Sequence, residues 1–396
     1  MGWFESIEHN RWLSEQMRAL IAEAEGAIVP TGFAHLTPEG SADPERSIDL
    51  AVTARMLYVF SLGVLMGLPG SRRYADHAVR SITKYFVDPV NGGHYTAIKA
   101  EPSSDGHGVP WDSDGEGKSQ FHNAFLILGA AAAAVADRPG AHELLTEALH
   151  DQERHWLEPN GLIRDQISGD YSTVLPIRSM DSLLHTAEAY LAAAEATTDP
   201  VWVERAEVMA NFVYNNASGH NWRPIEYFDD QWKPLKELPK VLTDGRHVYE
   251  GTSTGHSMHW ARIALHIRAA YRSMGRTQPE YLMDMATELF ERARVDGWRR
   301  NGKPGFATTV DDNGEPLEKE HMQWVSCEGI CAAVALRRAM LDDGASHGDV
   351  EHYEHCYRSW LDYVNDYLIK QPGRWVRMLT EDNEPVDGLK RSRWDV

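Results

Sequence analysis

Two kinds of segment with helical periodicity alternate along the chain. Segments near 10–27, 72–87, 141–157, 199–216, 279–295 and 349–369 carry one apolar stripe among many charged residues, which is typical of helices with one solvent-facing side. Segments near 46–67, 119–137, 179–196, 254–274 and 322–341 are rich in alanine and apolar most of the way round, as buried helices are. The pattern therefore predicts an outer and an inner set of helices.

Short turns rich in glycine and aromatic residues join the helices into hairpins. The turns lie near 28–33, 91–95, 160–163, 219–222, 301–306 and 372–375. Their spacing of roughly 60 to 85 residues is longer than the 20 to 50 residues of solenoid repeats. Such hairpins bury their apolar faces against one another in a closed ring. We therefore expect an all-α (α/α)6 barrel of six helical hairpins.

No Pro/Ser-rich linker divides the chain, so residues 1–396 are expected to form a single domain. The sixth hairpin stops after its outer helix. The last inner helix is therefore expected to be missing, which would leave the barrel incomplete at its C-terminus.

Composition narrows the classes of partner. The formal charge of −20 argues against nucleic acid and an anionic membrane surface, because phosphate-rich partners need clustered Lys and Arg. The longest apolar run, 124–136, is shorter than the roughly 20 residues of a membrane-spanning helix. The first residues show neither a basic nor an apolar signal region, so no secretory signal is expected, and three cysteines are too few for a disulfide framework. A cytoplasmic location is expected.

Polar residues gather at the predicted starts of the inner helices. In a ring of hairpins these starts converge on one face, where unpaired N–H groups and positive helix ends surround a cavity. The candidates are Arg55, Asn123, Arg178, Asp181, His185, Arg246, His256, His259, Trp324 and Glu328. Turn aromatics would form a wall: Phe33, Tyr95, Trp222 and Trp375. Such a pocket suits a sugar, which has apolar C–H faces and polar edges.

The spacing of the candidates along each predicted helix shows which of them share a helix face or lie at a helix start. Asp181, His185 and Glu188 share one helix face, so Asp181 can orient His185; a solvated stripe is the alternative. His256 follows a glycine at a helix start, where the dipole would lower its pKa and leave a neutral base. Surface salt bridges are the alternative for Arg178 and Arg246.

Neither a metal nor another cofactor is expected. His256 and His259 lie one helical turn apart, but no carboxylate completes a recognisable ligand set in the sequence. The chain also has no Gly-rich phosphate-binding loop and no nicotinamide fingerprint.

These residues and several short motifs resemble the N-acylglucosamine 2-epimerase superfamily, and within it the sulfoquinovose isomerase and aldose–ketose (mannose) isomerase branch. The motifs include Val29-Pro-Thr-Gly-Phe33, Thr53-Ala-Arg-Met56, His185-x-x-Glu188-Ala189, Gly255-His256 and Trp324-x-x-x-Glu328. The resemblance covers essentially the whole chain. It implies an (α/α)6 barrel that isomerises an aldose to its 2-ketose, with a histidine moving a proton between C2 and C1 of a cis-enediol.

The resemblance also implies roles for individual residues. His256 would be half of an acid/base pair, and His185 would bind or open the sugar ring. Arg55 and Arg246 would hold hydroxyls or a C6 sulfonate. The chain departs from the family at His259, where a Glu is usual, at Asp181, where an Asn is usual, and at Arg377, where the sulfoquinovose branch has a Gln. It also ends where a Tyr-His pair should open the last inner helix.

Two hypotheses therefore stand. The first is a working isomerase or 2-epimerase in which His259 supplies a base. The second is a catalytically impaired, sugar-binding relative. A glycoside hydrolase that uses Asp181 and Glu328 is a third alternative. The expected partner is a monosaccharide, and a homo-oligomer is left open.

Overall fold

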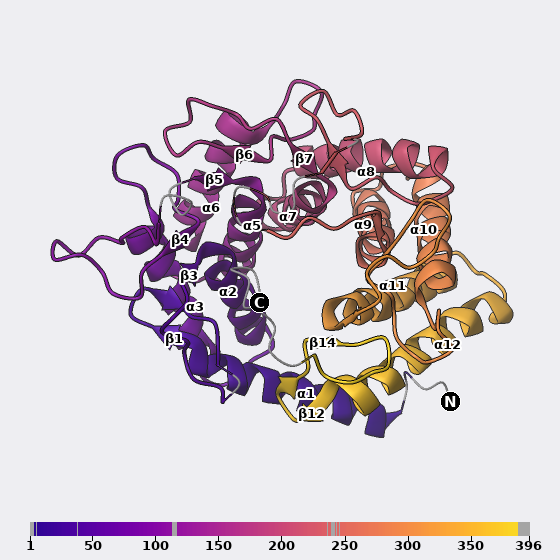
Figure 1. Ribbon diagram of the computed structural model, residues 1–396. Helices are drawn as coiled ribbons and strands as arrows, with labels where there is room; N and C mark the ends of the chain where they lie inside the picture. The colour runs from indigo at the N-terminus through magenta and orange to yellow at the C-terminus, as the bar shows by residue number, and fades with distance from the viewer. Residues whose placement is uncertain are drawn as a thin grey trace.

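The computed structural model describes residues 4, 6–37, 39–112, 117–235, 237–238, 242, 244 and 246–386. Helices of two kinds alternate along this part of the chain and form two rings (Figure 1). The outer helices are α1 (Ile7–Ala24), α3 (Ser71–Ser81), α6 (Ala141–Asp151), α8 (Val201–Gly219), α10 (Tyr281–Gly297) and α12 (His347–Tyr363). The inner helices are α2 (Leu50–Leu65), α5 (Gln120–Val135), α7 (Met180–Thr197), α9 (Thr254–Ser273) and α11 (Gln323–Asp342). The predicted all-α barrel of helical hairpins is confirmed.

Small residues let the inner helices approach one another closely. Every residue of α5 from 120 to 134 is buried. At Gly129 an added Cβ would lie 2.5 Å from the carbonyl oxygen of Ala54 on α2, so the backbones of the two helices approach each other closely here. Large side chains such as Tyr190 and Trp260 are fully buried in the core. The Ala-rich pattern thus has a packing cause.

Short antiparallel strands interlock neighbouring hairpins at one end of the barrel. The pairs are β3 (Ile48–Asp49) with β4 (Ala97–Ile98), β5 (Lys118–Ser119) with β6 (Gln166–Ile167), β7 (Arg178–Ser179) with β8 (Tyr227–Phe228), β9 (Thr252–Ser253) with β10 (Thr309–Val310), and β11 (His321–Met322) with β14 (Met378–Leu379). The first strand of each pair leads into an inner helix, and its partner follows the next outer helix. Two residues are too few for a period-2 pattern, so the sequence did not reveal these strands.

The strands bring the starts of the inner helices to one face. Asp49, Ser179 and Ser253 then cap α2, α7 and α9, because their side chains accept backbone N–H groups of the first turn. Two further pairs, β1 (Ile28–Val29) with β2 (Gly32–Phe33) and β12 (Ile369–Gln371) with β13 (Arg374–Trp375), form turns that follow outer helices.

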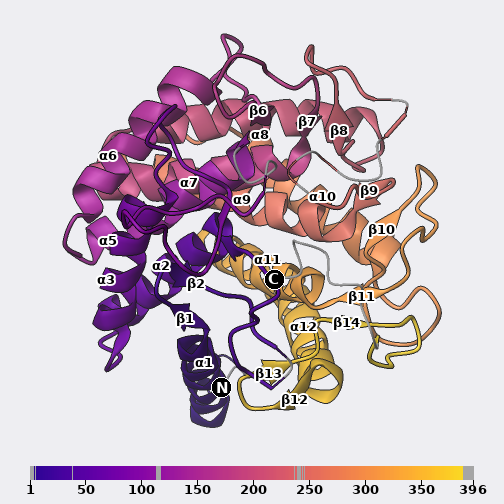
Figure 2. The same cartoon turned by 60° about the vertical axis from the view of Figure 1, so that its left-hand side comes forward.

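Outer helices from the two ends of the described chain lie side by side (Figures 1 and 2). The imidazole Nε2 of His9 on α1 lies 2.8 Å from the hydroxyl of Tyr357 on α12, and Arg374 forms an ion pair with Glu23. No inner helix lies between α11 and α2 among the described residues. The predicted start of the sixth inner helix falls outside them.

The four turn aromatics do not form one wall. Phe33 is fully buried against Phe60, and Trp222 packs on Tyr214 of α8. Tyr95, by contrast, lines a cavity among the loops at the strand end of the barrel. In the described part of the chain, no helix is long and apolar enough to cross a membrane.

Candidate active site

Three imidazoles and four carboxylates meet where α7, α9 and α11 begin. We call this group the imidazole cluster: His185, Asp181 and Glu188 from α7, His256 and His259 from α9, Glu328 from α11, and Glu226, which precedes β8. The sequence had singled out all of them except Glu226. The structure therefore brings together candidates that are up to 147 residues apart, from Asp181 to Glu328.

His256 is held at the start of α9. Its Nδ1 lies 2.8 Å from Oε2 of Glu226, and its Nε2 lies 3.6 Å from Oδ1 of Asp181. Burial alone would lower the pKa of His256, but the charges of Glu226 and Asp181 outweigh burial and raise the pKa to about 9. The prediction of a neutral base at this position is therefore wrong. The nearby carboxylates act more strongly than the helix dipole.

The other face of the His256 ring lies beside Trp324, with 5.4 Å between ring centroids. Gly255 makes this contact feasible, because an added Cβ would clash with the indole of Trp324. The glycine that precedes His256 thus serves packing against α11.

His259 lies between two glutamates. Its Nε2 is 3.2 Å from Oε1 of Glu188, and its Nδ1 is 3.5 Å from Oε1 of Glu328. Arg262 contacts the same two carboxylates, at 3.0 Å from Glu188 and 3.2 Å from Glu328. Burial lowers the pKa of His259 and outweighs the two glutamates, whose charge Arg262 offsets. The burial of the ring thus favours the neutral form of His259.

His185 contacts two carboxylates of its own helix. Its Nε2 lies 3.4 Å from Oδ1 of Asp181, and its Nδ1 lies 3.6 Å from Oε2 of Glu188. The ring packs against Phe125, with 4.5 Å between centroids. Burial would lower the pKa of His185, but Asp181 and Glu188 raise it. The expected contact between Asp181 and His185 is present.

Arg246 is enclosed by aspartates. Its guanidinium donates to Asp165 at 2.7 Å, to Asp181 at 2.9 Å and to Asp244 at 2.9 Å, and also to the hydroxyl of Ser182 at 3.0 Å. Asp165 and Asp244 had escaped the sequence analysis, because they lie in different loops and show no local pattern. Burial opposes the charge of Arg246, but the aspartates raise its pKa.

Arg55 differs sharply from Arg246. Its guanidinium lies over Phe125, 3.9 Å from the ring centroid. Among the described residues it forms no ion pair, although Asp49, Asp181 and Glu188 influence it at longer range. Burial lowers the pKa of Arg55. No described residue accepts a hydrogen bond from the guanidinium, so its donors can contact a ligand.

Three candidates lie outside the imidazole cluster. Asn123 donates to Gln152 at 2.8 Å within a buried amide network. Arg178 forms an ion pair with Glu158 at 2.8 Å. A salt bridge was the alternative to sugar binding that the sequence left open for this residue. Trp375 belongs to β13 and packs with residues of a separate small core.

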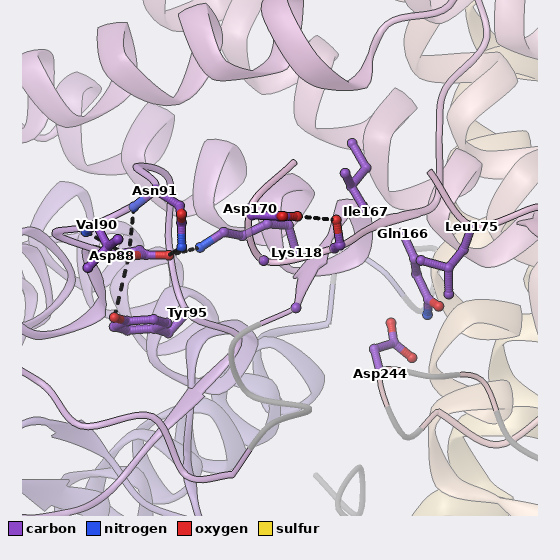
Figure 3. Close-up of a pocket in the computed structure, with 13 residues that line it drawn as sticks. Asp88, Val90, Asn91, Tyr95, Lys118, Gln166, Ile167, Asp170, Leu175 and Asp244 are labelled. Carbon is purple, nitrogen blue, oxygen red and sulfur yellow. Dashed lines mark hydrogen bonds and ion pairs between the residues drawn. The ribbon is translucent and has the colours of Figure 1, made fainter. Parts of the chain in front are cut away.

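Two cavities border these groups. One, of about 560 Å³, lies among loops at the strand end of the barrel; it holds the ion pair of Asp88 and Lys118 and includes Asp244 (Figure 3). The other, of about 700 Å³, is lined by residues of α2, α5, α7 and α9, including Glu188 and Arg262. No group of three or more described His, Cys, Asp or Glu side chains is arranged to hold a metal.

Residues 32–396 match the sequence profile of the N-acylglucosamine 2-epimerase (GlcNAc 2-epimerase) family. The chain is 35% identical over 393 residues to a D-mannose isomerase of Thermobifida fusca, which covers 98% of this chain and 91% of that protein. It is 31% identical over 399 residues to a D-mannose isomerase of Pseudomonas cannabina pv. alisalensis, at 100% and 92% coverage.

Solved structures show the same fold. A crystal structure of D-mannose isomerase superposes with a TM-score of 0.81 at 21% identity, covering 98% of this chain and 94% of that chain. Cellobiose 2-epimerase from Spirochaeta thermophila DSM 6192 superposes with a TM-score of 0.78 at 20% identity, covering 97% and 92%. At these sequence identities, the superpositions show only that the fold is shared.

Proposed function

The chain belongs to the N-acylglucosamine 2-epimerase family of sugar isomerases and epimerases, and from that premise we propose that it interconverts a neutral aldose of the mannose type and its 2-ketose. One observation carries the proposal. His256 and His259 lie one turn apart on α9, and their surroundings shift their pKa values in opposite directions. Two neighbouring groups with separated pKa values provide an acid and a base at the same pH.

Aldose–ketose isomerisation needs both. In the proposed reaction, neutral His259 takes the proton from C2 of the open-chain aldose while protonated His256 donates a proton to O1. This gives a cis-enediol. His256 then takes the proton from O2, and His259 returns its proton to C1, which yields the ketose. Arg55 stabilises the developing negative charge with its free donors.

The charge of the site favours a neutral sugar over sulfoquinovose. A C6 sulfonate needs an available cation. Arg246 already faces Asp165, Asp181 and Asp244, and the proposed reaction uses Arg55 at the developing negative charge. Arg262 likewise faces Glu188 and Glu328. Burying an anion beside compensated arginines and several carboxylates is unfavourable. The D-mannose isomerases similar to this chain agree with this choice.

The test is proton exchange during turnover. D-mannose is incubated with the protein in D2O, and fructose formation and deuterium at C1 and C2 are followed by NMR. We expect fructose from mannose and at least tenfold lower kcat/KM for sulfoquinovose. Glucose in place of fructose would identify a 2-epimerase. Sugar binding with neither product nor exchange would identify the impaired relative and refute the proposal.

Variants assign the acid and the base. His256→Gln and His259→Gln should each lower kcat/KM by about a hundredfold or more, the usual contribution of a positioned acid or base. His150→Gln serves as the matched control, because His150 is exposed on outer helix α6. Full activity in either cluster variant would contradict the assigned role of that histidine.

A further inference from the structure

We propose that Glu226 is a positioning residue for His256: it fixes which imidazole nitrogen carries hydrogen toward the protein and which faces the substrate. Neither the motifs nor the helix-face arguments pointed to this residue. The inference rests on the proposed function for its kinetic consequences, but the geometry stands by itself.

Glu226 connects the starts of two inner helices. It lies immediately before β8 and is buried, with 4% of its surface exposed. Its carbonyl oxygen accepts the backbone N–H of Met180, the first residue of α7, at 2.7 Å. Its carboxylate Oε1 accepts the N–H of Ser253, which caps α9, at 2.9 Å. One residue thus holds the starts of the helices that carry all three histidines.

The second carboxylate oxygen sets the state of His256. Oε2 of Glu226 lies 2.8 Å from Nδ1 of His256. An ionised carboxylate only accepts hydrogen bonds, so Nδ1 carries the hydrogen and donates it. Nε2 is then the nitrogen left for chemistry, and it lies 3.6 Å from Oδ1 of Asp181. A carboxylate behind an imidazole holds the ring in this way in many enzymes.

Other charged and titratable groups also face His256. Asp181 approaches it from α7, Glu328 acts on it from α11, and Tyr249 stacks edge-on from the loop before β9. Burial lowers the pKa of His256, and Glu226 is the strongest of the groups that raise it. Removing the charge of Glu226 should therefore lower the pKa of His256.

The size of the kinetic effect depends on how far the pKa of His256 falls. At pH 8 a histidine with a pKa of about 9 is about 90% protonated, and a drop of more than one unit leaves less than about half of it protonated. The Glu226→Gln variant should thus lose at least about twofold in kcat at pH 8 and less at pH 6. The KM for mannose should change less than threefold, because Glu226 lies behind the imidazole.

A matched control separates positioning from support of the fold. Glu158 is another partly buried carboxylate that anchors loops, through Arg178 and the indole N–H of Trp232, but it contacts no histidine of the imidazole cluster. Glu158→Gln should leave the pH profile in place whatever it does to stability. Glu226→Asp keeps the negative charge on a side chain that is one methylene shorter. This variant should have a lower kcat, but its activity should fall at the same alkaline pH as that of the wild type. If Glu226 only supported the fold, Glu226→Gln and Glu226→Asp would both be less stable, and the pH dependence of kcat would be unchanged in both.

Nitrogen NMR gives a readout that does not depend on turnover. In protein labelled with ¹⁵N-histidine, the His256 signals are assigned by comparison with His256→Gln. We expect a pKa near 9 and the Nδ1–H tautomer above it; Glu226→Gln should lower the pKa by more than one unit. An unchanged pKa in Glu226→Gln would overturn the inference. If mannose is not a substrate, this titration still decides the role of Glu226, so failure of the proposed function is distinguishable.

Discussion

Replacing Arg246 with methionine tests whether this arginine supports the site or binds the sugar. The methionine is of similar length and uncharged. The substitution would leave Asp165, Asp181 and Asp244 without the cation that contacts each of them at 2.7 to 2.9 Å. Arg246 is only 5% exposed, so the three carboxylates depend on it more than exposed carboxylates would. We expect Arg246→Met to destabilise the protein rather than only weaken substrate binding.

The magnitude follows from the burial of the charges. Removing one partner from a buried ion pair costs about 3 to 5 kcal/mol, because the remaining charge is left uncompensated. Three carboxylates lose their partner, but relaxation or protonation of the aspartates keeps the three losses from adding up. We therefore expect a decrease of about 3 to 5 kcal/mol in the free energy of unfolding at pH 7.5. Arg178→Met is the control, because Arg178 has one carboxylate partner and two backbone carbonyl partners.

The pH dependence adds a second readout. The pKa values of Asp181 and Asp244 are below their ordinary value although burial opposes this, partly because of Arg246. Carboxyl groups with depressed pKa values stabilise the fold above about pH 4 and lose that contribution as the pH falls through the lowered pKa. Without Arg246 these pKa values rise, so the unpaired aspartates bind protons before the wild-type ones do. The stability deficit of Arg246→Met should thus be largest near pH 7.5.

Urea denaturation at pH 7.5 and pH 5, followed by far-UV circular dichroism, measures both effects. The deficit of Arg246→Met should narrow by about 1 kcal/mol or more at pH 5, while that of Arg178→Met should change less. A deficit below about 1 kcal/mol at pH 7.5, the size of an exposed salt bridge, would refute a structural role. A large rise in KM without loss of stability would instead make Arg246 a substrate ligand.

Two further predictions concern packing and pH. Gly129→Ala should lower the free energy of unfolding by about 1 to 3 kcal/mol, because the clash of the new methyl with the backbone oxygen of Ala54 outweighs the gain in helix propensity. The control Gly219→Ala, which has open space around its Cβ, should cause no such loss. Equal urea midpoints for the two variants would contradict the close approach of α2 and α5. His256 has a raised pKa of about 9 in the folded protein, so it contributes stability that is complete below pH 6.5 and is lost as the pH rises through 9. Thermal melts should therefore show wild-type stability falling by at most about 3 kcal/mol between pH 7 and 10, and the same fall in His256→Gln would assign it to other groups.

At His256 the local sequence and the tertiary structure favour opposite protonation states. The sequence shows a histidine after a glycine at a helix start, and a helix dipole favours the neutral form by only about 0.3 to 1 kcal/mol. The structure adds Glu226, 30 residues earlier, whose charge at hydrogen-bond distance outweighs the dipole. A local rule predicted the wrong protonation state, because the decisive carboxylates come from other parts of the fold.

Sequence by itself determined the architecture and the face of the barrel on which the polar candidates gather. Helical segments with one solvent-facing side alternate with Ala-rich segments. This alternation specifies two rings, because each hairpin can bury its apolar face only against its neighbours. The polar residues at the inner-helix starts then indicate the face that carries Asp181, His185 and His256.

The tertiary structure alone decided what each group can do. Electrostatic interactions change over a few ångströms, and the distances depend on two-residue strands that leave no period in the sequence. Those strands place Glu226 behind His256, and the fold draws Asp165 and Asp244 around Arg246. This is why Arg246, an expected sugar ligand, is occupied by the protein itself while Arg55 retains free donors.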